Sequence, residues 1–103
     1  MARIYVLGGK DVGRDFEIED GFVVGRIDAC DVTLHHPSVS RKHARFEVAD
    51  GVWSLVDLGS RNGVRLADGS PAGDSVQLAD RAEVLLGELL LRFRTEELGD
   101  EED

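Results

Sequence analysis

The sequence predicts an all-β domain, and three observations support this fold class. Short alternating or continuous apolar runs recur roughly every 8–12 residues along the chain. Glycine-containing turns separate the runs, and Asp50-Gly51 forms the strongest two-residue hairpin signal between two of them. No segment keeps apolar residues at positions i, i+3, i+4 and i+7, the pattern of an amphipathic helix. We therefore expect an antiparallel β-sandwich.

The first half of the chain supplies five expected strands. Most of them alternate apolar and polar residues, as strands with one buried face do, and the apolar run FVVG ends at Gly25. In chain order the expected strands are residues 3–7 (RIYVL), 15–19 (DFEIE), 22–25 (FVVG), 31–34 (DVTL) and 44–48 (ARFEV).

The second half supplies five more strands, together with the turns that pair them. The turns Asp50-Gly51, Asp68-Gly69 and Gly87-Glu88 predict that neighbouring strands run antiparallel. The expected strands are residues 52–58 (VWSLVDL), 63–66 (GVRL), 74–78 (DSVQL), 83–86 (EVLL) and 89–93 (LLLRF).

Composition limits the class of protein further. A length of 103 residues suits one domain, and 42% hydrophobic content is typical of a globular chain. No apolar run is long enough to span a membrane and the N-terminus lacks a signal-peptide pattern, so we expect a cytoplasmic protein without membrane contact. The single cysteine, Cys30, excludes an internal disulfide and a cysteine metal framework.

Acidic residues are concentrated at the C-terminus. Residues 96–103 contain six acids and no base, and most of the formal net charge of −9 comes from them. A segment so acidic and so poor in apolar residues cannot pack against a core. We expect a folded domain over residues 1–95 and a disordered tail over residues 96–103.

Residues 35–46 gather positive charge within this acidic chain. The stretch HHPSVSRKHARF contains Arg41, Lys42, Arg45 and all three histidines. A local cationic cluster of this kind predicts a negatively charged ligand. Most of the cluster falls in one of the three longest interruptions between expected strands, where loops on a rigid scaffold usually carry function. These interruptions are residues 26–31, 35–42 and 58–62.

Each of the three loops presents groups suited to an anionic peptide. Gly25 ends an apolar strand and Arg26 follows directly, which places a planar five-donor guanidinium at the strand exit. In the second loop Ser40 precedes Arg41, so a hydroxyl and a cation can meet one anion. In the third loop Asn62 offers an amide donor and an acceptor that can bind a peptide backbone.

An enzyme is a weaker interpretation of the same residues. His43 follows Ser40 by three positions, and Asp57 could serve as an orienting acid. A nucleophilic triad also needs an oxyanion hole and usually a strained nucleophile turn such as G-x-S-x-G, which this sequence lacks. We therefore expect His43 to support the loop, and we assign no catalytic residue.

Metal and nucleic-acid binding are also disfavoured. Adjacent histidines in a strand or turn point apart, and the four candidate ligands Cys30, Asp31, His35 and His36 have no diagnostic spacing. The chain is acidic even without its tail, and no series of aromatic residues accompanies the basic loops. We expect neither a metal site nor a nucleic-acid partner.

The spaced G-R, S-x-x-H and N-G elements on three loops of an all-β chain resemble the forkhead-associated (FHA) domain, a phosphothreonine-peptide binding module. The resemblance covers about residues 3–94, and the blocks HPSVSRKHA and DLGSRNG are the most similar to the family. It implies a sandwich of about eleven strands, with the binding loops at one end and the termini at the other. It implies no cofactor.

The resemblance also implies a role for individual residues. Arg26 and Ser40 would bind the phosphate, Asn62 would hydrogen-bond the main chain of the ligand, and Arg41 and Arg61 would flank the site. Gly25, His43 and Gly63 would shape it. The sequence departs from the common family pattern at three positions. These are Cys30, where asparagine is usual, and Arg61 and Val64, where threonine is usual.

The expected function is phosphothreonine-dependent binding of a protein or peptide in signalling, with a substrate of a Ser/Thr kinase as the partner. The alternative is a phosphate-independent scaffold that uses the same loops or a sandwich face. Thr95, followed by Glu96, Glu97 and Leu98, could itself be phosphorylated and bound head to tail by a second copy of the chain. The alternative, which we favour from the sequence, is that Thr95 only ends the last strand before a solubilising tail.

Overall fold

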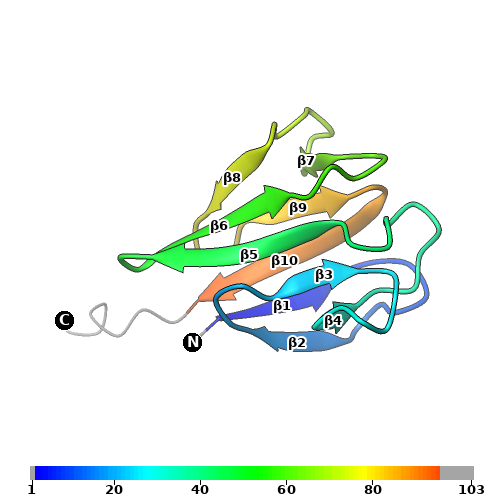
Figure 1. Ribbon diagram of the computed structural model, residues 1–103, viewed down its shortest axis with the longest axis horizontal. Coiled ribbons are helices and arrows are strands. Elements are labelled where there is room, and N and C mark those ends of the chain that lie inside the picture. The colour runs from blue at the N-terminus through cyan, green and yellow to red at the C-terminus, as the bar shows by residue number, and fades with distance from the viewer. Residues whose placement is uncertain (1, 96–103) are drawn as a thin grey trace.

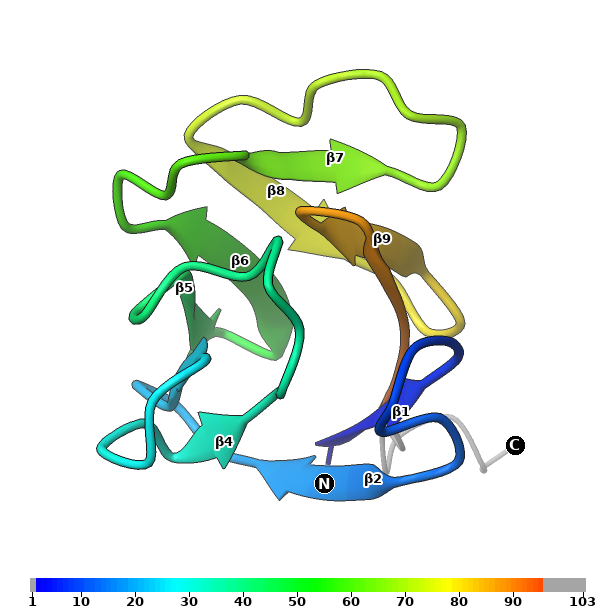
Figure 2. The same cartoon turned by 90° about the vertical axis from the view of Figure 1, so that its right-hand side faces the viewer.

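A computed structural model describes residues 2–95 of the chain, and Met1 and residues 96–103 lie outside the described part. The described residues form two five-stranded β-sheets that pack face to face (Figures 1 and 2). Across this part of the chain, no helix has the length and apolar character needed to cross a membrane. The predicted all-β sandwich is confirmed, whereas the predicted disordered tail falls on residues that are not described.

The first sheet contains the N-terminal and C-terminal strands of the domain. All of its neighbouring strands pair antiparallel, and the longest strand lies at its centre. Its order is β2 (Asp15–Ile18), β1 (Ala2–Val6), β10 (Leu89–Thr95), β9 (Glu83–Leu86) and β7 (Val64–Leu66).

The second sheet is built from the middle of the chain. Its central strands β5 and β6 form a hairpin, and its order is β4 (Val32–Thr33), β3 (Val23–Gly25), β5 (Ala44–Ala49), β6 (Val52–Asp57) and β8 (Ser75–Leu78). The ten strands match the ten expected runs in order. The resemblance implied about eleven strands, and residues 2–95 also contain an isolated bridge between Arg65 and Pro71.

Two turns predicted from dipeptides are hairpins. Ala49 pairs with Val52 across Asp50-Gly51, whose φ angles of 53° and 78° are the two positive values that a tight hairpin turn requires. Leu86 pairs with Leu89 across the second turn, Gly87-Glu88. These two turns confirm the strand pairing that the sequence indicated. The third predicted turn, Asp68-Gly69, connects β7 to β8, which lie in different sheets, and among the described residues only the isolated bridge between Arg65 and Pro71 closes across it.

One strand pair departs from the expectation that neighbours run antiparallel. Strands β3 and β4 are parallel, with Val24 opposite Val32 and Gly25 opposite Thr33. A parallel pair normally needs a long crossover connection. Here β4 is only two residues long, so the short loop between the two strands is enough to bring the chain back alongside β3.

The core lies between the two sheets and follows the alternation of the strands. Ile4 on β1, Phe46 on β5 and Leu55 on β6 are almost completely buried, and their sequence neighbours are more exposed. The rings of Trp53 and Phe93 meet across the sandwich with their centroids 5.8 Å apart. Each such buried side chain contributes about 1.5–3 kcal/mol, so this core makes the sandwich a rigid scaffold for its loops.

The three loops singled out in the sequence lie at the opposite end of the sandwich from the start of β1 and the end of β10. The loops that follow β1, β3, β4 and β6 gather at the right-hand end of Figure 1, with the β9–β10 hairpin beside them. The start of β1 and the end of β10 lie at the left-hand end, where the β5–β6 hairpin also lies (Figure 1). The arrangement implied by the resemblance is confirmed, and all three loops singled out in the sequence meet at one end.

Candidate functional site

An open groove of about 420 Å³ lies between the loops at this end. The five residues expected to contact a ligand all line it, although they come from three separate loops. The full lining comprises Arg26, Pro37, Ser38, Val39, Ser40, Arg41, Lys42, Gly59, Arg61 and Asn62. It includes four cations and no carboxylate, in a chain whose formal net charge is −9. The groove is therefore suited to an anion.

Ser40 connects the three loops. Its carbonyl oxygen accepts the backbone N–H of Arg26 at 3.0 Å, and its Oγ accepts the backbone N–H of Arg61 at 2.9 Å. Because Oγ uses a lone pair in that contact, its own hydrogen stays available for donation. Ser40 therefore fixes the positions of Arg26 and Arg61 and presents a hydroxyl donor between them.

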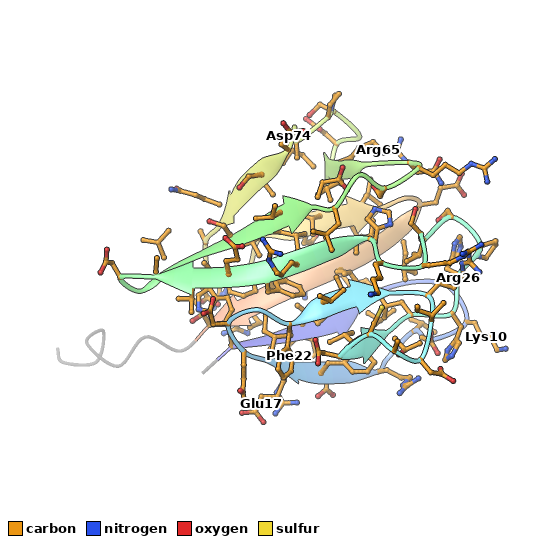
Figure 3. The ribbon with its side chains drawn as sticks, in the orientation of Figure 1. Lys10, Glu17, Phe22, Arg26, Arg65 and Asp74 are labelled. Atoms are coloured by element: carbon orange, nitrogen blue, oxygen red, sulfur yellow. The ribbon has the colours of Figure 1, made fainter. Side chains whose placement is uncertain are left out.

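The side chain of Arg26 is anchored at one end and exposed at the other. Its Nε donates to the carbonyl oxygen of Val39 at 2.9 Å, while the residue itself is exposed at the loop end of the molecule (Figure 3). The anchor restricts the rotation of the guanidinium, and the contact leaves the Nη donors for a ligand. An arginine held in this way loses less conformational entropy when it binds a phosphate or a carboxylate.

The carbonyl group of Arg41 explains why the residue before Arg26 is a glycine. A Cβ atom on Gly25 would lie 2.1 Å from this oxygen, which is far too close for any side chain. The same oxygen accepts hydrogen bonds from the backbone N–H of Arg26 at 3.0 Å and from Sγ of Cys30 at 3.1 Å. Burial raises the pKa of the Cys30 thiol, which keeps it protonated as a donor. Cys30 therefore helps hold the first loop against the second.

His43 lies behind the groove and is completely buried. Its Nδ1 accepts the backbone N–H of Ser40 at 3.0 Å, and Nε2 lies 2.9 Å from the carbonyl oxygen of Gly63, so the neutral ring donates its proton there. Burial lowers the pKa of the imidazole below its usual value of 6.5. The ring bonds to backbone atoms and leaves Ser40 Oγ to Arg61, so it does not form a nucleophile–base pair with that hydroxyl.

Asn62 sits at the rim of the groove with part of its amide already engaged. Its Nδ2 donates to the carbonyl oxygen of Ser38 at 2.9 Å, which fixes the plane of the amide. The bend that carries Asn62 ends at Gly63, whose φ of +75° suits a glycine and whose N–H donates to Ser60 Oγ at 2.9 Å. The second amide hydrogen and Oδ1 form no further hydrogen bond within the described residues.

Five lining residues were not predicted from the sequence, namely Pro37, Ser38, Val39, Lys42 and Gly59. Lys42 and Ser38 are the two of them with polar side chains. Lys42 stood out only as part of the basic cluster, and its position beside Arg41 was the available signal. Ser38 has no such signal, because its role depends on long-range contacts. Its Oγ accepts the backbone N–H of Glu88 at 2.8 Å, and it packs so closely on Gly87 that a Cβ there would lie 2.2 Å from the Ser38 carbonyl oxygen. The β9–β10 hairpin therefore supports the groove.

Comparison with protein families and curated proteins gives one consistent match. The FHA domain model matches residues 22–87. The glycogen accumulation regulator GarA of Mycobacterium tuberculosis is 34% identical over 91% of this chain, and the chain spans 57% of the length of GarA. The human mediator of DNA damage checkpoint protein 1 is 34% identical over 90% of the chain, which corresponds to 5% of that protein.

Solved structures of FHA domains share the fold. One, from a structural and functional analysis of phosphothreonine-dependent FHA domain interactions, has a TM-score of 0.82 at 28% identity and covers 94% of this chain and 98% of its own. The FHA domain of the CT664 protein from Chlamydia trachomatis has the same TM-score and identity, with coverage of 93% and 98%. The FhaA FHA domain, complexed with the intracellular domain of Rv3910, has a TM-score of 0.79 at 27% identity and covers 91% and 100%.

Proposed function

Because the chain belongs to the FHA domain family, we propose that it is a phosphothreonine-dependent protein–protein interaction module that acts in signalling. The observation that carries this proposal is the groove itself. Four cations and the Ser40 hydroxyl converge there without a carboxylate, in a chain that is acidic overall. The similar FhaA domain, in complex with an intracellular domain of another protein, supports a protein partner.

In this proposal Arg26 and Ser40 bind the phosphate. A phosphothreonine carries about −1.5 to −2 charges and three strong acceptor oxygens. The Arg26 guanidinium is oriented by Val39, and the Ser40 hydroxyl keeps a free hydrogen, so both can donate to these oxygens. Charge-assisted hydrogen bonds contribute roughly 1.5–3 kcal/mol each, which is enough to make binding depend on the phosphate.

The remaining residues of the groove have supporting roles in the proposal. Asn62 hydrogen-bonds the main chain of the ligand with the part of its amide that Ser38 does not use. Arg41 and Arg61 flank the phosphate, and Gly25, His43 and Gly63 hold the loops in register. We assign no catalytic step and no cofactor to this arrangement.

The ligand follows from this chemistry. A phosphothreonine is made by a Ser/Thr kinase, so the partner is a kinase substrate or a kinase that phosphorylates itself. Because such kinases draw on the ATP of the cell interior, we place the module in the cytoplasm.

Self-association is a further part of the proposal. Thr95 ends β10 at the opposite end of the sandwich from the groove (Figure 1). A phosphate on Thr95 therefore binds the groove of a second copy, in a head-to-tail contact that can extend into rings or chains. Thr95 pairs with Ala2 and donates its N–H to Asp80, so the end of β10 must open first.

Titration of paired peptides tests the proposed function. Each pair has one sequence, with and without a phosphate on threonine, and calorimetry measures the two dissociation constants. We expect measurable affinity for the phosphorylated member and a loss of at least about 30-fold without phosphate, which corresponds to roughly 2 kcal/mol. Equal affinities would instead identify a phosphate-independent scaffold.

A further inference from the structure

The four cations of the groove form no ion pair with another residue of the described chain. Arg26, Arg41, Lys42 and Arg61 are all exposed, and within residues 2–95 none of them forms an ion pair. The chain has 21 acids, so carboxylates are plentiful elsewhere on its surface. The lack of a carboxylate among the groove residues is therefore specific to this end of the molecule.

Most arginines outside the groove form an ion pair with a carboxylate of the chain. Five of the seven arginines outside the groove lie within ion-pair distance of a carboxylate, whereas Arg65 and Arg81 do not within the described residues. The pairs are Arg3–Asp15, Arg14–Asp11, Arg45–Glu47, Arg92–Glu83 and Arg94–Asp80. Pairing within the chain is thus common outside the groove, whereas the cations of the groove are left for a ligand.

One phosphate does not match the charge of the groove. A phosphothreonine brings about −1.5 to −2 charges, and the four side chains bring +4. Arg26 and the Ser40 hydroxyl already suffice to bind the phosphate under the proposed function. About two positive charges then remain in the groove, and a second anionic group on the ligand would be attracted to them.

The surplus cations belong to residues next to Ser40, which binds the phosphate under the proposed function. Arg41 and Lys42 follow Ser40 directly in the chain, and the backbone N–H of Arg61 is bonded to Ser40 Oγ. An extended peptide advances about 3.3 Å per residue. A second anionic group within a few residues of the phosphothreonine can therefore reach these side chains, and the planar guanidinium suits both carboxylate and phosphate.

We propose that the groove selects phosphothreonine segments that carry a second anionic group, which Arg41, Lys42 and Arg61 bind. The second group is a carboxylate of a flanking acidic residue or a second phosphate. This inference rests on the proposed function and specifies its ligand. The preferred partner is a phosphorylated segment that is acidic around the threonine, although the module itself is acidic overall.

Fluorescence anisotropy with labelled synthetic peptides tests this inference. The peptides share one phosphothreonine and differ in the flanking residues, which are alanines, glutamates, lysines or a second phosphothreonine. We expect the glutamate or the doubly phosphorylated peptide to bind at least about tenfold more tightly than the alanine peptide at low salt, and the lysine peptide to bind most weakly. A gain for glutamate identifies a carboxylate as the second anion. A gain confined to the doubly phosphorylated peptide identifies a second phosphate.

Three variants test whether the groove cations cause the preference for the acidic peptide. Lys42→Gln and Arg61→Gln should each reduce the ratio between the acidic and alanine peptides to about threefold or less. Arg45→Gln is the matched control, because Arg45 pairs with Glu47 and does not line the groove, and it should leave the ratio unchanged. Circular dichroism checks that each variant is folded.

Two results would overturn the inference in distinguishable ways. If the phosphorylated peptides all bind within twofold of one another, the second anion has no role, although the proposed function stands. If unphosphorylated glutamate peptides bind as tightly as phosphorylated ones, the proposed function fails and the inference fails with it.

Discussion

The backbone amide of Ser40 donates a hydrogen bond to Nδ1 of His43 at a distance of 3.0 Å. On its other side the buried ring reaches the carbonyl oxygen of Gly63 at 2.9 Å. One imidazole therefore connects the loop that carries Ser40 to the loop that carries Asn62. The position of the groove depends on this connection, although the ring itself does not line the groove.

Replacing His43 by alanine should lower the stability of the domain by about 2–4 kcal/mol, because it creates a cavity and leaves the Ser40 amide unpaired. Urea denaturation measures the change. Phosphopeptide binding should weaken as a consequence of the loosened loops. His35→Ala is the matched control, since 48% of that side chain is exposed, and it should cost much less. A His43→Ala protein that is fully stable yet unable to bind would show that His43 contacts the ligand.

The lowered pKa of His43 predicts that the stability of the domain depends on pH. Burial lowers the pKa of His43 below 6.5, so the unfolded chain takes up a proton at a higher pH than the folded one. The contribution of His43 to stability is complete above about pH 6.5 and is progressively lost as the pH falls from there towards the lowered pKa. His43→Ala should flatten the stability profile in this range, and an unchanged slope would contradict the assignment.

Gly25→Ala should disrupt the site by pushing two loops apart. The new Cβ would lie 2.1 Å from the carbonyl oxygen of Arg41, which is backbone and cannot rotate away. We expect a loss of at least about 1–3 kcal/mol in unfolding free energy together with weaker phosphopeptide binding. Gly8→Ala is the control, because nothing lies within 4 Å of a Cβ at that position and its φ is not positive. Equal stability of the two variants would exclude this close approach.

Arg26→Ala should leave the fold intact and weaken phosphopeptide binding by at least roughly 2 kcal/mol, because it removes a charge-assisted contact to the phosphate. Calorimetry measures the affinity, and thermal denaturation confirms the fold. Arg92→Ala, on a sheet face away from the groove, should bind like the unmodified protein. An unchanged affinity for Arg26→Ala would refute the site.

Added salt should weaken binding of the phosphopeptide more steeply than binding of the same peptide with glutamate in place of phosphothreonine. The phosphate carries more charge and more acceptor oxygens, so screening removes a larger part of its attraction. Titrations over a range of ionic strength give the two slopes. Binding that is insensitive to salt would indicate apolar contacts in place of ionic ones.

Phosphorylation of Thr95 should raise the mean mass seen by light scattering as the protein concentration increases. The groove and Thr95 lie at opposite ends of the sandwich, so the contact forms between molecules (Figure 1). Introducing Arg26→Ala into the phosphorylated protein should restore the monomer. If the phosphorylated protein stays monomeric at high micromolar concentration, the self-association proposal is wrong.

Much of the fold could be predicted from local sequence. Alternation places Ile4, Phe46 and Leu55 on the buried face of their strands, and Asp50-Gly51 determines one hairpin through its two positive φ angles. Both signals depend on residues that are close in the chain, so they can be recognised from the sequence without knowledge of the tertiary structure. The parallel pairing of β3 with β4 was predicted wrongly, because strands this short carry no local signal of their direction.

The candidate site, like the fold, was predicted only in part from the sequence. The sequence by itself indicated which residues have donors suited to an anionic peptide, because Arg26, Ser40 and Asn62 carry such donors and occur next to turn residues. Only the tertiary structure decided that the backbone N–H of Arg61 donates to Ser40 Oγ and that Asn62 Nδ2 donates to the Ser38 carbonyl oxygen. It also decided that Lys42 lines the groove. These contacts join loops that are distant in the chain, and their geometry is set by how the two sheets pack. The hydrogen-bond donors belong to the individual residues, whereas the packing of the sandwich brings these donors together in one groove.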